Sequence, residues 1–215
     1  DAFSQDVRAG VLDDAERYGM RIVIDDQLPP ELNDMAVTLA KIKALKPDML
    51  VVSGHEKGAI TAVTQIKAMK VRLPIIAMTH CDSAELAEKF AEASEHIFCA
   101  GQWHPELDYK DELFGTASDF AKSFKAAYGY EAPYQAAQSA ASVQVFADAI
   151  NRAQSLEPAK VRDALAATEL QTFFGKVKFD GSGRNIAKPM VLCQIRGGKY
   201  LIVAPKDWKK GEAVI

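Results

Sequence analysis

The sequence lacks two features that would point to particular partners. Its 26 basic and 29 acidic residues give a formal net charge of −3, and they alternate along the chain without forming a basic stripe. A nucleic-acid partner is therefore not expected. Long apolar runs are also missing, since the longest, such as "LPIIAM", are far too short to span a bilayer.

Metal-binding and catalytic motifs are equally scarce. The three cysteines, Cys81, Cys99 and Cys193, show no C-x-x-C spacing and cannot all pair within the chain. Cys99 and Cys193 lie inside apolar runs, which favours buried, small-hydrophobe behaviour and leaves the redox compartment open. The four histidines form no H-x-x-x-H pair, and no G-x-S-x-G occurs. No metal and no cofactor are expected.

The start of the chain, "DAFSQDVRAG", shows neither a starting methionine nor the basic and apolar regions of a signal peptide. We interpret it as a mature protein or an excised fragment.

What is present in the first hundred residues is a regular alternation of helix and strand patterns. Helices are predicted over 4–18, with Ser4 as N-cap, and over 34–45, 60–69 and 83–93. Short buried strands are predicted at "RIVID" (21–25), "KPDMLVV", "LPIIAM" and "HIFCAG". This order predicts an α/β fold, a doubly wound parallel sheet. Unusually for such a layer, no strand precedes the first helix.

After Trp103 the pattern changes to three helical segments without strands between them, at 113–127, 134–153 and 158–167. A strand then runs into the Gly-rich "DGSGRN", and a hairpin is predicted about Gly197–Gly198. The composition shifts near 102–110 and 184–189 are the candidate domain boundaries.

The segment "AMTHCD" (77–82) concentrates reactive side chains. His80 and Cys81 are adjacent, so in an extended segment they face opposite ways and make a poor nucleophile–base pair. Asp82 to Glu85 fits a capping box, which we favour over a catalytic acid.

Position gives this segment another meaning, because ligands of parallel sheets bind beyond the carboxyl ends of the strands. The loops 1–6, 53–58 and 78–82 share that place. Six side chains would then lie on one rim: Phe3, Ser4, His55, Glu56, Thr79 and His80. Ordinary solvated loops with caps remain an equal alternative.

The order of motifs resembles a known family. The stretches that carry it are "KPDMLVVSG", "TQIKAMKVRLPIIAMT", "FAKSFKAAYGYEAPYQAAQSAASVQVFADAINRA", "TFFGKVKFDGSGRN" and "QIRGGKYLIVAP". Together they resemble the type I periplasmic solute-binding proteins of ABC transporters, in the branched-chain amino acid (leucine/isoleucine/valine) binding family. The resemblance covers essentially the whole chain.

The resemblance implies two lobes joined by a hinge that close on a ligand. Residues 1–102 and 189–205 would form the C-terminal (second) lobe, and 105–186 an incomplete N-terminal (first) lobe. Hinge crossings would lie near 102–104 and 188. A long N-terminal stretch of the family has no counterpart, so we interpret the chain as a C-terminal fragment that could pair with another chain through its open sheet edges.

The resemblance also implies site residues. Phe3 matches an aromatic contact of the family, and Thr79–His80 fall where amino-acid binders place an acidic residue. The predicted ligand-binding set is Phe3, Ser4, His55, Thr79, His80, Gln102, Trp103, Tyr134 and Gln135. Trp103 could equally be hinge core.

The predicted function is therefore a non-enzymatic, solute-binding component of an ABC importer. It would act in the periplasm or outside the cell, bind an amino acid or related compound, and deliver it to a membrane permease. The alternatives are a ligand-sensing domain of a receptor or regulator with the same fold and, less favoured, an α/β enzyme using His80 and Cys81.

Overall fold

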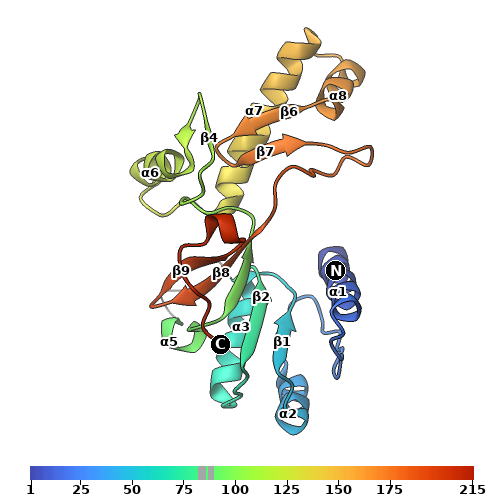
Figure 1. Cartoon of the computed structure of the whole chain (residues 1–215), viewed down its shortest axis with the longest axis vertical. Helices are drawn as coiled ribbons and strands as arrows, with labels where there is room; N and C mark the ends of the chain where they lie inside the picture. Colours follow the sequence, from blue (N-terminus) through green and yellow to red (C-terminus); the bar gives the residue numbers. More distant parts are fainter. Residues whose placement is uncertain (82–85, 87–89) are drawn as a thin grey trace. The chain divides into compact units, whose positions relative to one another are not determined.

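The computed structural model describes residues 1–81, 86 and 90–215 (Figure 1). These residues divide into two compact units. Unit 1 comprises Asp1–Gly101 and Leu192–Ile215, and unit 2 comprises Gln102–Val191. Among the described residues, no helix combines the length and apolarity needed to cross a membrane.

Unit 1 is built on one five-stranded sheet of order β1-β2-β3-β8-β9. Its elements are α1 (Ala2–Arg17), α2 (Ala36–Leu45), β1 (Met49–Val52), α3 (Glu56–Ala68), β2 (Ile75–Thr79), α5 (Ala91–Ser94), β3 (Phe98–Gly101), β8 (Val191–Arg196), β9 (Lys199–Ala204) and the 3₁₀ turn η1 (Lys206–Trp208). Neighbouring strands among β1, β2 and β3 pair in parallel, while β8 and β9 form an antiparallel hairpin. The predicted α/β class, the strands at β1, β2 and β3 and the final hairpin are thus confirmed.

The core of unit 1 is aliphatic and is supplied by the predicted helical stripes. Leu39 and Ile42 of α2 and Val63 of α3 are almost fully buried together with Met78 of β2. Residues three or four apart lie on one face of a helix, so the apolar spacing in the sequence becomes one buried surface.

Two predictions at the start of unit 1 are wrong. The N-cap of α1 is Asp1, whose Oδ1 accepts a hydrogen bond from the Ser4 backbone N at 2.9 Å. Residues 21–25 form no strand, and Ile22 and Val23 are exposed. A strand needs a hydrogen-bonding neighbour, and apolar composition alone cannot supply one. The capping box predicted at Asp82–Glu85 lies outside the described residues.

Unit 2 combines helices with two small antiparallel strand pairs. Its elements are β4 (Lys110–Asp111), β5 (Gly115–Thr116), α6 (Ala117–Tyr128), α7 (Tyr134–Ala153), α8 (Pro158–Ala166), β6 (Glu169–Thr172) and β7 (Gly175–Lys178). β4 pairs with β5 and β6 pairs with β7. The helix expected from 113 begins at Ala117, because a capping box between Thr116 and Asp119 fixes its start.

The core of unit 2 is aromatic. The rings of Phe120 and Phe173 stack with centroids 4.2 Å apart, and Trp103 meets both edge-on at 6.0 and 6.4 Å. The Trp103 Nε1 donates a hydrogen bond to the Phe173 carbonyl at 3.3 Å. This contact satisfies the one polar group of a side chain that is only 5% exposed.

Candidate functional site

Three rings gather beyond the carboxyl ends of β1 and β2. Phe3 comes from the first turn of α1, His55 directly precedes α3, and His80 directly follows β2. The ring centroids of Phe3 and His80 are 5.0 Å apart, those of His55 and His80 5.2 Å, and those of Phe3 and His55 5.6 Å. We call these three residues the ring cluster. It unites side chains from three separate segments of the chain, which the sequence placed on one rim.

A carboxylate fixes one side of the ring cluster. The His55 Nε2 lies 2.9 Å from Asp1 Oδ2, while the other oxygen of Asp1 caps α1. Asp1 is thus engaged on both oxygens, although it was not among the predicted site residues. The available signal was the type of residue: aspartate is a preferred N-cap, and Asp1 stands three residues before Ser4, whose backbone N it accepts from.

The other side of the ring cluster is held by Gly54. The Gly54 carbonyl accepts hydrogen bonds from Thr79 Oγ1 at 2.7 Å and from His80 Nδ1 at 2.8 Å. The Gly54 backbone N donates to Thr79 Oγ1 at 2.9 Å. Because a carbonyl can only accept, Nδ1 of His80 is the donor in this hydrogen bond. Thr79 therefore joins the ends of β1 and β2, and the Gly54 carbonyl orients the His80 ring.

The backbone of His80 is also constrained. Its φ of 50° lies in the left-handed region, which is uncommon for a non-glycine residue and concentrates at functional sites. Two contacts anchor the next residue: Cys81 forms a disulfide with Cys99, and the Tyr200 hydroxyl donates to the Cys81 carbonyl at 2.6 Å. The rim is thereby tied to both β3 and β9.

The disulfide corrects the sequence analysis. Cys99 is buried, as predicted, yet it is bonded to Cys81 and is not a free small hydrophobe. The parallel register, which pairs Met78 with Cys99, brings Cys81 within a Cα–Cα distance of 5.6 Å. Cys193 is buried, as predicted, and lies outside the disulfide. A disulfide-bonded Cys81 has no thiolate to offer, so the interpretation as a His80–Cys81 enzyme is wrong.

The remaining predicted site residues belong to unit 2. Tyr134 and Gln135 begin α7, with Gln135 exposed. The Gln102 carbonyl accepts a hydrogen bond from Lys188 Nζ, which lies 4.5 Å from the centre of the Phe174 ring. Burial lowers the pKa of Lys188 to about 8. For Trp103 the sequence left two roles open, ligand contact and core residue, and its burial favours the core role.

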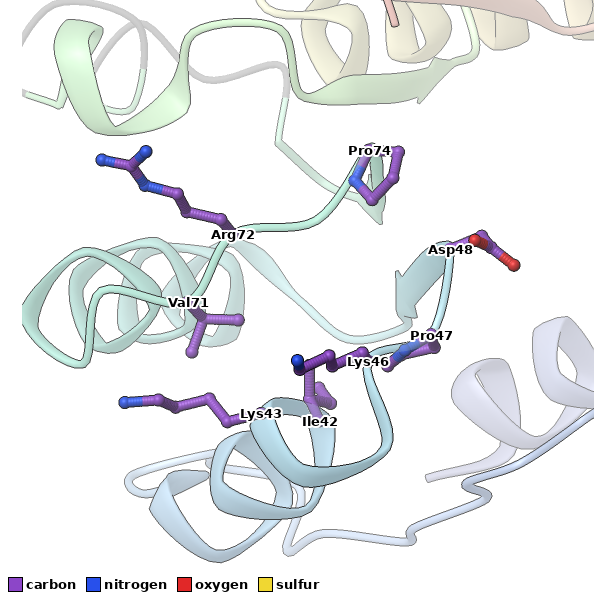
Figure 2. Close-up of a pocket in the computed structure, with 8 residues that line it drawn as sticks. All are labelled: Ile42, Lys43, Lys46, Pro47, Asp48, Val71, Arg72 and Pro74. Atoms are coloured by element: carbon purple, nitrogen blue, oxygen red, sulfur yellow. The ribbon is translucent and has the colours of Figure 1, made fainter.

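A small cavity of about 300 Å³ lies at the opposite ends of the strands (Figure 2). Pro47–Asp48 and Pro74, which precede β1 and β2, line it together with the basic residues Lys43, Lys46 and Arg72. The Lys43 Nζ donates to the Met69 carbonyl at the end of α3 at 3.2 Å. Lysines at helix C-termini complement the helix dipole. This cavity therefore has a structural explanation, and the ring cluster is the better candidate site.

Metal binding finds no support within residues 1–81, 86 and 90–215. In that part of the chain, no three side chains of His, Cys, Asp or Glu gather closely enough to hold an ion.

Comparison with known proteins bears on the family and the fold of the chain. A family model described as "Periplasmic binding protein" matches residues 1–199. The substrate-binding protein LivJ of Streptococcus pneumoniae, solved with isoleucine, is 22% identical to this chain and matches it with a TM-score of 0.74. The match covers 90% of this chain and 56% of LivJ. A solute-binding protein of R. palustris, solved with benzoate, is 20% identical and has a TM-score of 0.77. That match covers 91% of this chain and 53% of the R. palustris protein.

A third solved structure, an extracellular ligand-binding receptor from Rhodopseudomonas palustris HaA2, is 19% identical with a TM-score of 0.79. The match covers 94% of this chain and 60% of the receptor chain. The chain thus spans between half and three fifths of the length of the solved relatives it matches. At these identities the likeness establishes the fold.

Proposed function

Because the chain belongs to the periplasmic binding protein family, we propose that it forms part of the solute-binding component of an ABC importer. The family and the solved relatives are solute-binding proteins and not enzymes. The observation that carries the proposal is the ring cluster, which lies where parallel sheets bind their ligands.

We propose that the ligand is a small carboxylate without an ammonium group. The ring cluster offers imidazole groups beside the N-termini of α1 and α3, and helix N-termini favour anions. The carboxylate that contacts the cluster, Asp1, is already engaged by His55 and by the Ser4 backbone. An ammonium would therefore compete with these contacts, whereas an acid would not.

The apolar body of the ligand would lie against Phe3, which is 40% exposed. An aromatic acid suits this ring, since aromatic pairs gain beyond the area that they bury. The benzoate bound by the R. palustris relative is such a compound, while the isoleucine bound by LivJ carries an ammonium. We therefore rank aromatic acids before amino acids.

Delivery to a membrane permease, outside the cytoplasm, completes the proposal. The Cys81–Cys99 disulfide supports the location, because disulfides persist in oxidising compartments such as the periplasm. A sensing role with the same ligand chemistry is the second candidate, favoured by the description of the HaA2 relative as a receptor. The two candidates differ in the membrane partner that receives the loaded protein.

The test is ligand-observed saturation-transfer NMR on the chain with benzoate and isoleucine, a method suited to weak binding. We expect a benzoate signal that exceeds that of isoleucine and that falls at least five-fold in Phe3→Ala and His80→Asn. The matched control is His96→Asn, because His96 also has a left-handed φ, of 69°, and precedes β3. Asparagine tolerates this conformation.

Equal benzoate signals in His80→Asn, His96→Asn and the unaltered chain would refute the ring cluster as the site. An isoleucine signal that exceeds benzoate would refute the ligand class but keep the site.

A further inference from the structure

Unit 2 holds a half-buried cation, Lys188, that has no part in the ring cluster. Its Nζ donates a hydrogen bond to the Gln102 carbonyl. The same Nζ lies 4.5 Å from the centre of the Phe174 ring, whose face also stabilises a positive charge. An ammonium group carries three N–H donors, and the carbonyl takes only one of them. The ammonium therefore keeps donor capacity for a ligand.

The charge of Lys188 is not balanced by an acidic side chain. In the part of the chain that the structure describes, no carboxylate forms an ion pair with it. Burial lowers the pKa of Lys188 to about 8, whereas a neighbouring carboxylate would raise it. Removing a charge from water without a partner is costly. A bound anion would offset that cost.

The surroundings of Lys188 fix its side chain in place. Gly175 has a φ of 142°, in the region that favours glycine, and its lack of a side chain leaves room for the lysine stem. A Cβ at Gly175 would lie 2.4 Å from Lys188 Cδ. Phe174 is only 9% exposed, so the ring beneath the ammonium is itself held by packing. The cation is thus preorganised, which lowers the entropic cost of binding.

A second donor with a weak partner lies beside the same segment. Gln102 Nε2 donates to Met190 Sδ at 3.6 Å, and a thioether is a weak acceptor. Met190 stands two residues after Lys188 and is 46% exposed, so solutes can reach this segment from solvent. A carboxylate has two acceptor oxygens and bonds more strongly than a thioether. It could accept from the amide and from the ammonium together.

We propose that Lys188 and Gln102 form a binding site for a small monocarboxylate in unit 2. One oxygen of the ligand accepts from Lys188 Nζ and the other from Gln102 Nε2. A single cation and a neutral amide match one negative charge, whereas a dianion would keep a charge without a partner. The site is separate from the ring cluster, which belongs to unit 1, and either site can fail without the other.

The experiment follows the ¹³Cε signals of labelled lysines by NMR during pH titrations of the chain. The titrations are run in sodium chloride, acetate or benzoate at equal ionic strength, and Lys188→Met assigns the Lys188 signal. Acetate and benzoate should raise the Lys188 midpoint by about 0.5 or more relative to chloride, because the carboxylate binds the charged form. The exposed Lys160 is the internal control and should keep its midpoint.

Two further comparisons test how the carboxylate is recognised. Benzamide has the shape of benzoate without its charge, so it should leave the Lys188 midpoint at the chloride value. Gln102→Leu removes the amide and keeps the backbone carbonyl, and it should weaken carboxylate binding about five-fold, as the loss of one hydrogen bond does. Gln138→Leu, at an exposed position of α7, is the matched control and should bind as the unaltered chain does.

A Lys188 midpoint that is the same in acetate, benzoate and chloride would overturn the proposal. Equal carboxylate affinities of Gln102→Leu and the unaltered chain would overturn it as well, because the site would then lack its second donor. In Lys188→Met, benzoate should still shift the ring signals of His55 and His80. Failure of this site is therefore distinguishable from failure of the ring cluster.

Discussion

Unit 1 buries mainly aliphatic side chains and unit 2 mainly aromatic ones, and the difference follows from the size of their sheets. Unit 1 packs aliphatic residues such as Leu39, Val63 and Met78 around strands joined by nearby helices. Unit 2 relies on Trp103, Phe120 and Phe173, which come together from distant parts of the chain. Small strand pairs offer little surface of their own, so a few large rings carry this core. Stability in unit 2 should therefore depend on fewer residues.

The largest effect is expected from Phe173→Ala, since Phe173 is fully buried. The variant should lose about 3–5 kcal/mol of unfolding free energy. Amide exchange should accelerate in α7 but not in β2, because the two elements belong to different units. Tyr130→Ala, at a 57% exposed position, should cost less than about 0.5 kcal/mol. Equal acceleration in both units would show that they unfold as one body.

The next effect concerns a cross-link that only unit 1 has. Replacing Cys81 and Cys99 by alanine removes a loop closure over a sequence separation of 18. The loss should be about 3 kcal/mol, measured by urea unfolding. A reductant should destabilise the unaltered chain and leave the double variant unchanged. The variant Cys193→Ala, which alters a buried cysteine outside the disulfide, should be as sensitive to the reductant as the unaltered chain. An unaltered chain indifferent to the reductant would contradict the disulfide.

The smallest effect is a pH dependence in unit 2. Burial lowers the pKa of Lys188 to about 8, against an ordinary value of 10.5. Between these values the unfolded chain binds the proton and the folded chain does not, so the free energy of unfolding rises with pH. Lys188→Gln should flatten the rise in melting temperature between pH 8 and 10. The exposed Lys160→Gln is the control. If the melting temperature of Lys188→Gln still rises between pH 8 and 10, the pH dependence belongs to another titratable group.

The sequence predicted the parallel strands of unit 1 because their signals are local. Apolar runs bounded by turn residues mark β1, β2 and β3, and the apolar stripes of α2 and α3 are buried as expected. The stretch 21–25 has the same composition, but its pairing depends on a neighbour that composition does not reveal. The start of α6 was missed for a similar reason, since a side-chain cap at Thr116 fixes it.

The candidate site was partly predictable. The rule that strand ends share one edge of a sheet placed Phe3, His55 and His80 together, and their rings do lie within 5.6 Å of one another. Two determinants were missed because they need the register of the sheet: the disulfide of Cys81 and the Tyr200 hydroxyl that binds its carbonyl. The ligand-binding role of all these residues stays a prediction.

The central claim is that a small carboxylate binds at the ring cluster. The most direct measurement is a titration of the chain with benzoate, followed by the ring nitrogen signals of its four ¹⁵N-labelled histidines. The account predicts that the signals of His55 and His80 shift together and saturably, while those of His96 and His104 stay in place. Shifts at His96 or His104 alone, or no shift at His80, would contradict it.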